Sequence, residues 1–260
     1  MPSISQARDL IAMATLPSVA AFAADAPPGG GMPSFDASQD QSLVIGSDVV
    51  SFGTGVEAEF RQAIADSALF AQLAALHQVG SNADPMAFFS AYFEWLMKLG
   101  WIEQSRDTAE LEIKGGGFDV HTAITGVITA FLAPIAGAAA AVLAVLNGLH
   151  QMNATAPFIT LFNKRSTHQK IGKFQFTYVR KQDDGALLAQ MAAFGLVAEE
   201  AITQILFFQL HAHNSSVHRS LGALSIAPAA LDGIRAQLAG KVQAFRQSMI
   251  AEADLAPVEG

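Results

Sequence analysis

The feature that most constrains this chain is a long stretch without charge. No Asp, Glu, Lys or Arg occurs between Asp119 and Lys164, so 44 consecutive residues are uncharged. Residues 122–146 read TAITGVITAFLAPIAGAAAAVLAVL; these 25 residues exceed the about 20 that a helix needs to cross a bilayer. In water such a segment must be buried, because it would otherwise expose a larger apolar patch than monomers tolerate. It is therefore either a core element or an element that enters lipid.

The composition excludes several classes of protein. Of the 260 residues, 51% are hydrophobic and 15% are charged, which suffices for a large core. A formal net charge of −8 leaves no basic excess for phosphates, so we expect no nucleic-acid binding. The absence of cysteine excludes disulfides, thiolate zinc sites and thiol nucleophiles. No P-loop, G-x-S-x-G or H-E-x-x-H motif occurs, so we predict a protein that is not an enzyme and has no cofactor.

The N-terminus allows two interpretations. The apolar run 10–23 ends in a small-residue pattern typical of signal-peptide cleavage sites. Against a signal peptide, Arg8 is followed by Asp9, so there is no positive excess, and Pro17 interrupts the run. We favour an amphipathic helix followed by a linker at the Pro/Gly cluster 27–31. A secretory signal is the alternative.

The hydrophobic periodicity predicts an α+β fold. N-terminal helices, including a very apolar central helix or helical hairpin, precede a C-terminal antiparallel β-meander and a closing amphipathic helix. A capping box at Thr54 and Glu57 predicts where the first long helix of this part begins. The strands of the meander are expected at 158–162, 174–179, 186–198, 202–213 and 217–226.

We expect an N-terminal helix with its linker and one α+β domain. The predicted ranges are 1–31 for the helix and linker, 32–260 for the domain, 54–150 for its helical part, 156–226 for its β-rich part and 228–252 for the C-terminal helix.

The uncharged segment is the candidate functional site. Pro134 lies near its middle, where a kink or a hairpin tip would fall, and its many Ala and Gly residues suit close helix packing in lipid. The alternative is a purely structural helix or hairpin of the core. The residues expected to enter the membrane are Val120, Ile124, Val127, Ile128, Phe131, Leu132, Pro134, Ile135, Val142, Leu143, Val145 and Leu146.

Two further groups of residues are candidates for lesser roles. An apolar helix following Asp84-Pro85 carries aromatic side chains suited to a membrane interface, namely Phe88, Phe89, Tyr92, Phe93, Trp95 and Trp101. His211, His213 and His218 are weak metal candidates, since residues two apart on a strand share a face. No carboxylate lies among these histidines, and we predict that they bind no metal.

These patterns favour a protein that is soluble until it meets a bilayer. No Lys/Arg cluster adjoins the uncharged segment, which argues against a permanent anchor. The organisation is similar, in layout only, to colicin-type α-pore-forming domains. We predict a membrane-active protein, a pore-forming or membrane-perturbing bacterial toxin or effector, whose partners are a lipid membrane and further copies of itself. The alternative is a non-catalytic structural or binding protein that self-assembles through apolar helices. For the location we expect secretion or delivery out of the cell, with the cytoplasm as the alternative.

Overall fold

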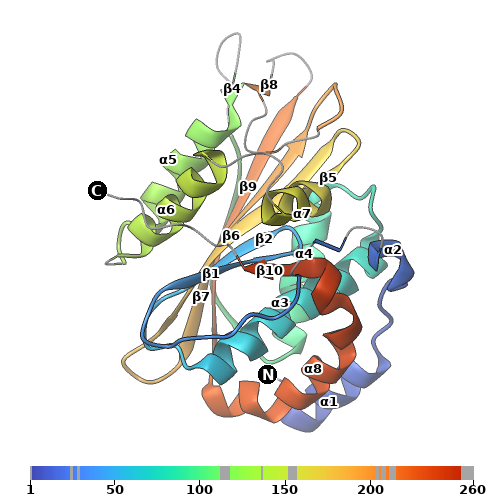
Figure 1. Cartoon of the computed structure of the whole chain (residues 1–260), viewed down its shortest axis with the longest axis vertical. Coiled ribbons are helices and arrows are strands. Elements are labelled where there is room, and N and C mark those ends of the chain that lie inside the picture. Colours follow the sequence, from blue (N-terminus) through green and yellow to red (C-terminus); the bar gives the residue numbers. More distant parts are fainter. Residues whose placement is uncertain are drawn as a thin grey trace.

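A twisted, mostly antiparallel sheet organises the fold, with helices on both of its faces (Figure 1). The computed structural model describes residues 2–23, 26–27, 30–111, 118–135, 137–151, 157–202, 205, 209–210 and 215–252. The strand order is β10-β1-β2-β6-β7-β9-β3, with β5 paired to β6 and a separate two-stranded sheet formed by β4 and β8. The predicted α+β fold is confirmed.

The strands of the main sheet differ in length, and three long ones form its centre. The strands are β1 (Gln41–Ile45), β2 (Asp48–Phe52), β3 (Ile102–Leu111), β5 (Thr167–His168), β6 (Ile171–Lys181), β7 (Leu187–Val197), β9 (Ser216–Ile226) and β10 (Ile250–Glu252). The small sheet contains β4 (Phe118–Asp119) and β8 (Gln209–Leu210). β6, β7 and β9 are antiparallel neighbours, as the predicted meander requires.

The helices form two layers. They are α1 (Ile4–Met13), α2 (Ala20–Ala23), α3 (Ala58–Val79), α4 (Pro85–Lys98), α5 (Val120–Leu132), α6 (Ala138–Gln151), α7 (Pro157–Ser166) and α8 (Pro228–Met249). One layer contains α3, α4 and α8, with α1 packed outside α8; the other contains α5, α6 and α7. Among the residues described, no helix has both the length and the apolarity to traverse a membrane.

Both faces of the central strands are apolar, which explains the two helical layers. On β6, Phe174, Phe176 and Tyr178 belong to the apolar cluster shared with α5, α6 and α7. Val179 faces the opposite way and belongs to the cluster shared with α3, α4 and α8. Each face must be covered, because an exposed apolar sheet face would be a large hydrophobic patch.

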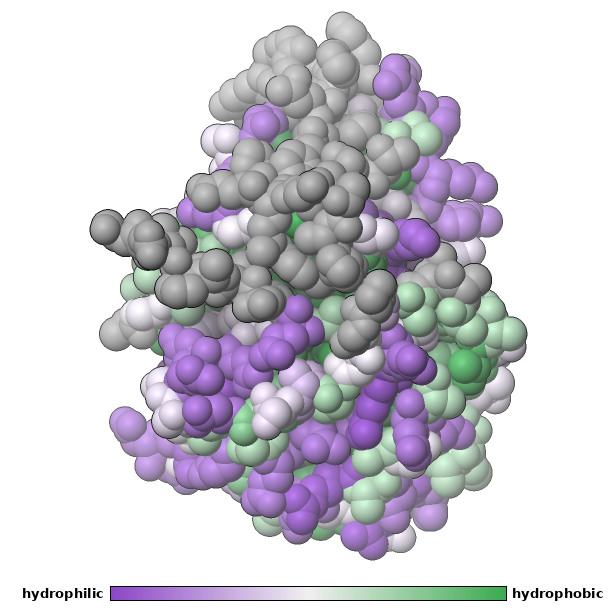
Figure 2. All heavy atoms as spheres, in the orientation of Figure 1, coloured by the Kyte–Doolittle hydropathy of each residue, from purple (hydrophilic) through white to green (hydrophobic). Residues whose placement is uncertain are grey.

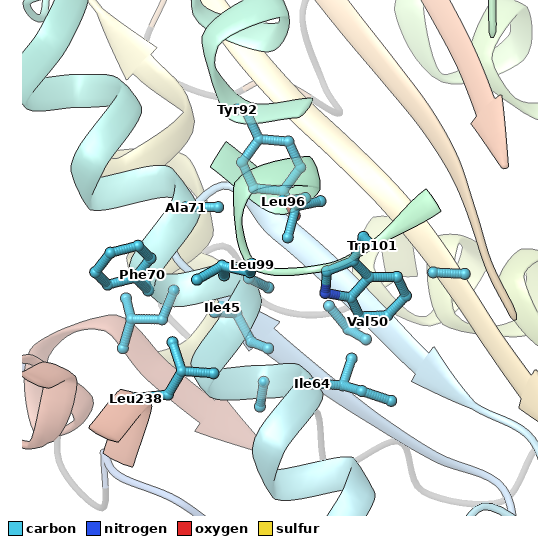
Figure 3. Close-up of a cluster of buried hydrophobic side chains, with 14 of the residues drawn as sticks. Ile45, Val50, Ile64, Phe70, Ala71, Tyr92, Leu96, Leu99, Trp101 and Leu238 are labelled. Carbon is cyan, nitrogen blue, oxygen red and sulfur yellow. The ribbon is translucent and has the colours of Figure 1, made fainter. Parts of the chain in front are cut away.

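The α3–α4–α8 layer encloses the larger apolar cluster. Figure 3 shows side chains from several elements converging there, with Phe70 of α3, Tyr92 and Leu96 of α4 and Leu238 of α8 close to Ile45 of β1. α3 itself is buried along most of its length, since it lies between the sheet and α8. This layer is therefore the main hydrophobic core.

Several local predictions are confirmed. Asp84 caps α4 by accepting hydrogen bonds from the backbone N–H groups of Met86 and Ala87 at 2.8 and 3.1 Å. The expected strands 174–179 and 186–198 are β6 and β7, which a turn at 183–185 joins, with Gly185 at a positive φ of 86°. The N-terminal amphipathic helix is α1, which Ser3 and Gln6 cap reciprocally.

Other local predictions are wrong. The expected strand at 158–162 is part of α7, because Pro157 suits a first helical position and the short apolar run fits either structure. Most of the expected strand 202–213 lies outside the described residues; of those described, 209–210 form β8, whereas Ile202 and Ile205 lie outside any strand. Thr54 caps no helix, since α3 begins at Ala58 and the Thr54 N–H bonds to Asp40.

Two strand pairings were not predicted. β2 pairs with β6 in parallel, and β10 ends the sheet by pairing with β1. β10 occupies the end of the expected C-terminal helix 228–252, because α8 stops at Met249. The segment 250–252 is too short to show a period of two.

A buried ion pair joins α3 to α8. Asp66 is 1% exposed and accepts two hydrogen bonds from the Arg246 guanidinium, one of them from Nε at 2.9 Å. An exposed pair, Arg235 with Glu59, joins the same two helices at 2.9 Å. The two pairs allow the effect of burial to be measured within one helix–helix contact.

We predict that Arg246→Met destabilises the protein far more than Arg235→Met. Removing Arg246 leaves the Asp66 carboxylate buried without its cation, which costs about 3–5 kcal/mol, whereas losing an exposed pair costs about 0–1 kcal/mol. Urea unfolding at pH 7 measures both. Equal losses of the free energy of unfolding would contradict the prediction that breaking the buried pair costs more than breaking the exposed one.

Candidate functional site

The uncharged segment folds as a helical hairpin of α5 and α6, which we call the hairpin (Figure 1). Asp119 begins α5 by accepting a hydrogen bond from the Thr122 N–H at 2.7 Å. α5 ends at Leu132, just before Pro134, which cannot donate the next helical hydrogen bond. Gly137 then adopts a φ of 79°, a conformation that suits glycine, and α6 returns along α5.

The inner side of the hairpin is apolar and packs on the sheet. Its buried residues lie at helical spacing and join the cluster of Phe174, Phe176 and Phe194. Of the predicted membrane-entering residues, Val120, Ile124, Ile128, Leu132, Val142, Val145 and Leu146 are buried, Val127, Phe131, Ile135 and Leu143 are half-buried, and Pro134 is exposed. The side chains expected to enter lipid are thus the ones that hold the hairpin to the sheet.

The outer side of the hairpin is uncharged as well. Among the hairpin residues whose exposure the structure describes, the exposed ones are small or weakly polar: Thr122, Gly126, Thr129, Ala130, Ala133, Pro134, Gly137, Ala140, Ala144 and Asn147. A surface helix of a soluble protein normally carries charge on its solvent side. The hairpin therefore has no charged group to desolvate if it leaves water.

Crevices run along both sides of the hairpin. One of about 520 Å³ lies beside α5, between Gly126, Phe131 and Leu221. The other, of about 430 Å³, lies beside α6, between Ala144 and the strands β1 and β2. The hairpin is thus flanked by open space along both of its arms.

The aromatic helix lies on the opposite face of the sheet from the hairpin. Five of the six aromatic residues predicted to be interfacial (Phe88, Phe89, Tyr92, Phe93 and Trp101) are buried in the core with α3. Trp95 is half-buried and donates a hydrogen bond to Gln78 at 2.9 Å. Their position therefore does not support the predicted interfacial role; α4 is apolar nearly all round because both the sheet and α3 cover it.

The histidine candidates are not brought together by the residues described. His211 and His213 lie outside the described residues, and His218 lies on β9 opposite Glu110 of β3. The described part of the chain contains no group of three or more His, Asp or Glu side chains placed to hold a metal ion.

Polar contacts hold the α3–α4–α8 layer to the sheet. Gln72 of α3 donates to the Ile45 carbonyl at 2.8 Å, and Lys173 of β6 donates to the Ser81 carbonyl between α3 and α4 at 3.0 Å. Arg61 of α3 is fully buried and donates to the carbonyls of Val56 and Gly53 at 2.8 and 3.1 Å. Such buried groups lose their partners if the layer separates from the sheet.

A buried carboxylate is the most unusual of these contacts. Asp48 of β2 lies within 3.0 Å of the Thr177 hydroxyl and accepts a hydrogen bond from Gln175 Nε2 at 2.6 Å. Gln175 Nε2 also lies 3.1 Å from the hydroxyl of Tyr92 on α4. Burial raises the pKa of Asp48 to about 7, although the hydrogen bonds from Gln175 and Thr177 lower it. The one sequence signal for this group was an acid inside the apolar run 43–52.

The two helical layers therefore differ in how they are attached. The α3–α4–α8 layer is joined to the sheet by apolar contacts and by buried polar groups, whereas the described contacts of the hairpin with the sheet are apolar. Apolar contacts can be exchanged for acyl chains at little cost, and buried polar contacts cannot. The contacts of the hairpin, unlike those of the α3–α4–α8 layer, therefore suit a transfer from sheet to lipid.

Comparison with known proteins gives remote resemblances only. No family model matches the chain, and no curated protein matches it in sequence. A delta-endotoxin structure is 11% identical with a TM-score of 0.37, over 70% of this chain and 82% of that one. The structure of the Evf virulence factor is 11% identical with a TM-score of 0.34, over 98% and 92%. The activated Cyt2Ba monomer from Bacillus thuringiensis subsp. israelensis is 15% identical with a TM-score of 0.26, over 50% and 75%.

We predict that Asp48→Asn changes the pH dependence of stability. The raised pKa means that folded Asp48 keeps its proton up to about pH 7, while the unfolded chain loses it near pH 4. The stability of the wild type therefore falls, relative to Asp48→Asn, by up to about 1.4 kcal/mol per pH unit between these values, and stays level above them.

Urea unfolding at pH 4.5, 6 and 8 measures this difference. Asp183→Asn is the matched control, because Asp183 is exposed at the β6–β7 turn. A difference between the wild type and Asp48→Asn that stays constant across the three pH values would contradict the prediction.

Proposed function

We propose that this chain is a non-catalytic, membrane-active protein whose hairpin leaves the sheet and enters lipid. The observation that carries the proposal is the hairpin itself, which is apolar inside and uncharged outside.

The hairpin can exchange its contacts with the sheet for contacts with lipid at little cost in free energy. In water the buried stripe of the hairpin has to pack on Phe174, Phe176 and Phe194, because it would otherwise be solvated. In a bilayer both helices satisfy their backbone hydrogen bonds internally, and the same side chains contact acyl chains. The soluble and inserted states can thus lie close in free energy, which is the condition for a switch.

The dimensions of the hairpin favour shallow insertion. α5 has 13 residues and α6 has 14, so each arm is about 20 Å long, against about 30 Å for the hydrocarbon core. As folded, the hairpin reaches into one leaflet and displaces lipid there. Its outer side is lined by small residues such as Gly126, Ala130 and Ala144, which suit close packing between the hairpins of several copies.

Insertion can be followed with a single fluorophore. The chain has no cysteine, so Ala144→Cys carries an environment-sensitive label at one exposed position of α6. With anionic vesicles we expect its emission to shift to the blue and to be quenched by quenchers attached to acyl chains. Ala236→Cys, at an exposed position of α8 in the other layer, is the matched control and should show neither change.

A charge on the outer side of the hairpin should block insertion without disturbing the soluble fold. We predict that Ala130→Asp lowers dye release from the vesicles, because a central Asp adds about 2.5–3.5 kcal/mol to insertion. Ala236→Asp places the same charge on an exposed position of α8 and should release dye like the wild type. Equal release by all three proteins, or a label at position 144 that neither shifts to the blue nor is quenched, would exclude insertion of the hairpin and favour a structural role.

A further inference from the structure

A cavity of about 600 Å³ lies apart from the hairpin, and no residue of the hairpin lines it. Its walls come from α2, the C-terminal part of α3, the start of α4, the end of α7, β5 and β6. This volume lies within the range of small-molecule sites, about 300–1,000 Å³. The cavity plays no part in the membrane contact described above.

The polar lining of the cavity is strongly basic. Five basic residues line it, namely His77, Lys164, Arg165, His168 and Lys173, and its described lining contains no Asp or Glu. This is notable in a chain with a formal net charge of −8. A cavity lined by one sign of charge attracts ions of the other sign.

Lys173 is the most informative of these groups. Its side chain is 6% exposed, its Nζ donates to the Ser81 carbonyl at 3.0 Å, and it lies 4.9 Å from the centre of the Phe88 ring. Burial lowers the pKa of Lys173 to about 8, with Asp84 acting in the opposite direction from outside the lining. An ammonium group has three donors, and an anion in the cavity would take up donors that Ser81 does not use.

Arg165 holds another wall of the cavity in place. One guanidinium nitrogen, NH2, donates to the carbonyls of Phe22 and Ser248 at 3.2 and 3.1 Å, and the guanidinium lies 4.8 Å from the centre of the Phe22 ring. The N-terminal segment is thereby held against α7 and the end of α8. One wall of the cavity is therefore formed by a segment distant in sequence, which Arg165 holds in place.

Most of the rest of the lining is apolar, although Ser47, Gln72, Ser81 and Thr167 also line the cavity. Leu73, Leu76, Phe88, Phe22 and Met249 surround the space beside the basic groups. Figure 2 shows hydrophobic residues gathered at the right-hand edge of the molecule, at the place where Figure 1 shows α2. The cavity thus combines a cationic part with an apolar part that continues towards the surface.

We propose that this cavity binds an amphiphilic anion, with its carboxylate or phosphate group near Lys173 and its alkyl chain along Leu73 and Leu76. The cationic part matches the head group, and the apolar part matches a short chain. The proposal is independent of hairpin insertion, because it concerns other residues and is tested without membranes.

Calorimetric titration at pH 7 tests this with four probes: octanoate and octyl phosphate, which carry both features, and 1-octanol and inorganic phosphate, which carry one each. We expect the first two to bind and the last two to bind at least about tenfold more weakly. Comparing octanoate with octyl phosphate shows which head group the cavity prefers.

Two variants locate the binding. Lys173→Met removes the buried ammonium without leaving a buried charge, and should weaken octanoate binding by about tenfold or more. Lys170→Met is its control, because Lys170 is exposed at the turn just before β6 and lies outside the cavity. Ala21→Trp fills the mouth of the cavity from α2 and should also weaken binding.

The outcomes separate clearly. Weak binding by Lys173→Met and Ala21→Trp, with Lys170→Met like the wild type, supports the proposal. It is overturned if octanoate and octyl phosphate fail to bind, if both variants bind like the wild type, or if 1-octanol or inorganic phosphate alone binds as tightly as the amphiphiles.

Discussion

The rest of the structure depends on a sheet that is apolar on both faces. β6, β7 and β9 carry large apolar side chains on alternate sides, so neither face can be left to water. Two helical layers are the consequence, and they differ in the charge and polarity of their sequences. α3, α4 and α8 bring charged outer surfaces and buried polar groups, whereas α5 and α6 come from a stretch without charge.

This difference gives each layer a separate role in the stability of the fold. The buried Asp66–Arg246 pair and the Asp48–Gln175–Tyr92 contacts make separation of the α3–α4–α8 layer costly. The hairpin packs on an apolar face of the sheet and has open crevices beside both arms. A protein that must be stable in water and yet change its surroundings can keep one layer fixed and release the other, and this arrangement meets both needs.

The sequence was sufficient where a single local signal decides the structure. The start of α4 at Asp84-Pro85, the break at Pro134 and the strands β6 and β7 were all predictable. The parallel pairing of β2 with β6 and the strand β10 were not, because pairing between distant segments leaves no local pattern. The cationic cavity could not be predicted either, since Lys173 and Arg165 line one cavity only after the two layers and the N-terminal segment have packed. The unbroken charge gap revealed the hairpin, but not which face it covers.

The order of the elements along the chain has a consequence for biosynthesis. Residues 120–151, which form the hairpin, leave the ribosome before β6 and β7, which bury its apolar side. At about 5–20 residues per second, the emergence of Val197 follows that of Gln151 by roughly 2–9 s. During that interval the nascent chain presents its most apolar helices without their sheet. A chaperone that holds this segment, or a membrane close to the ribosome, would therefore compete with folding in the cell that makes the protein.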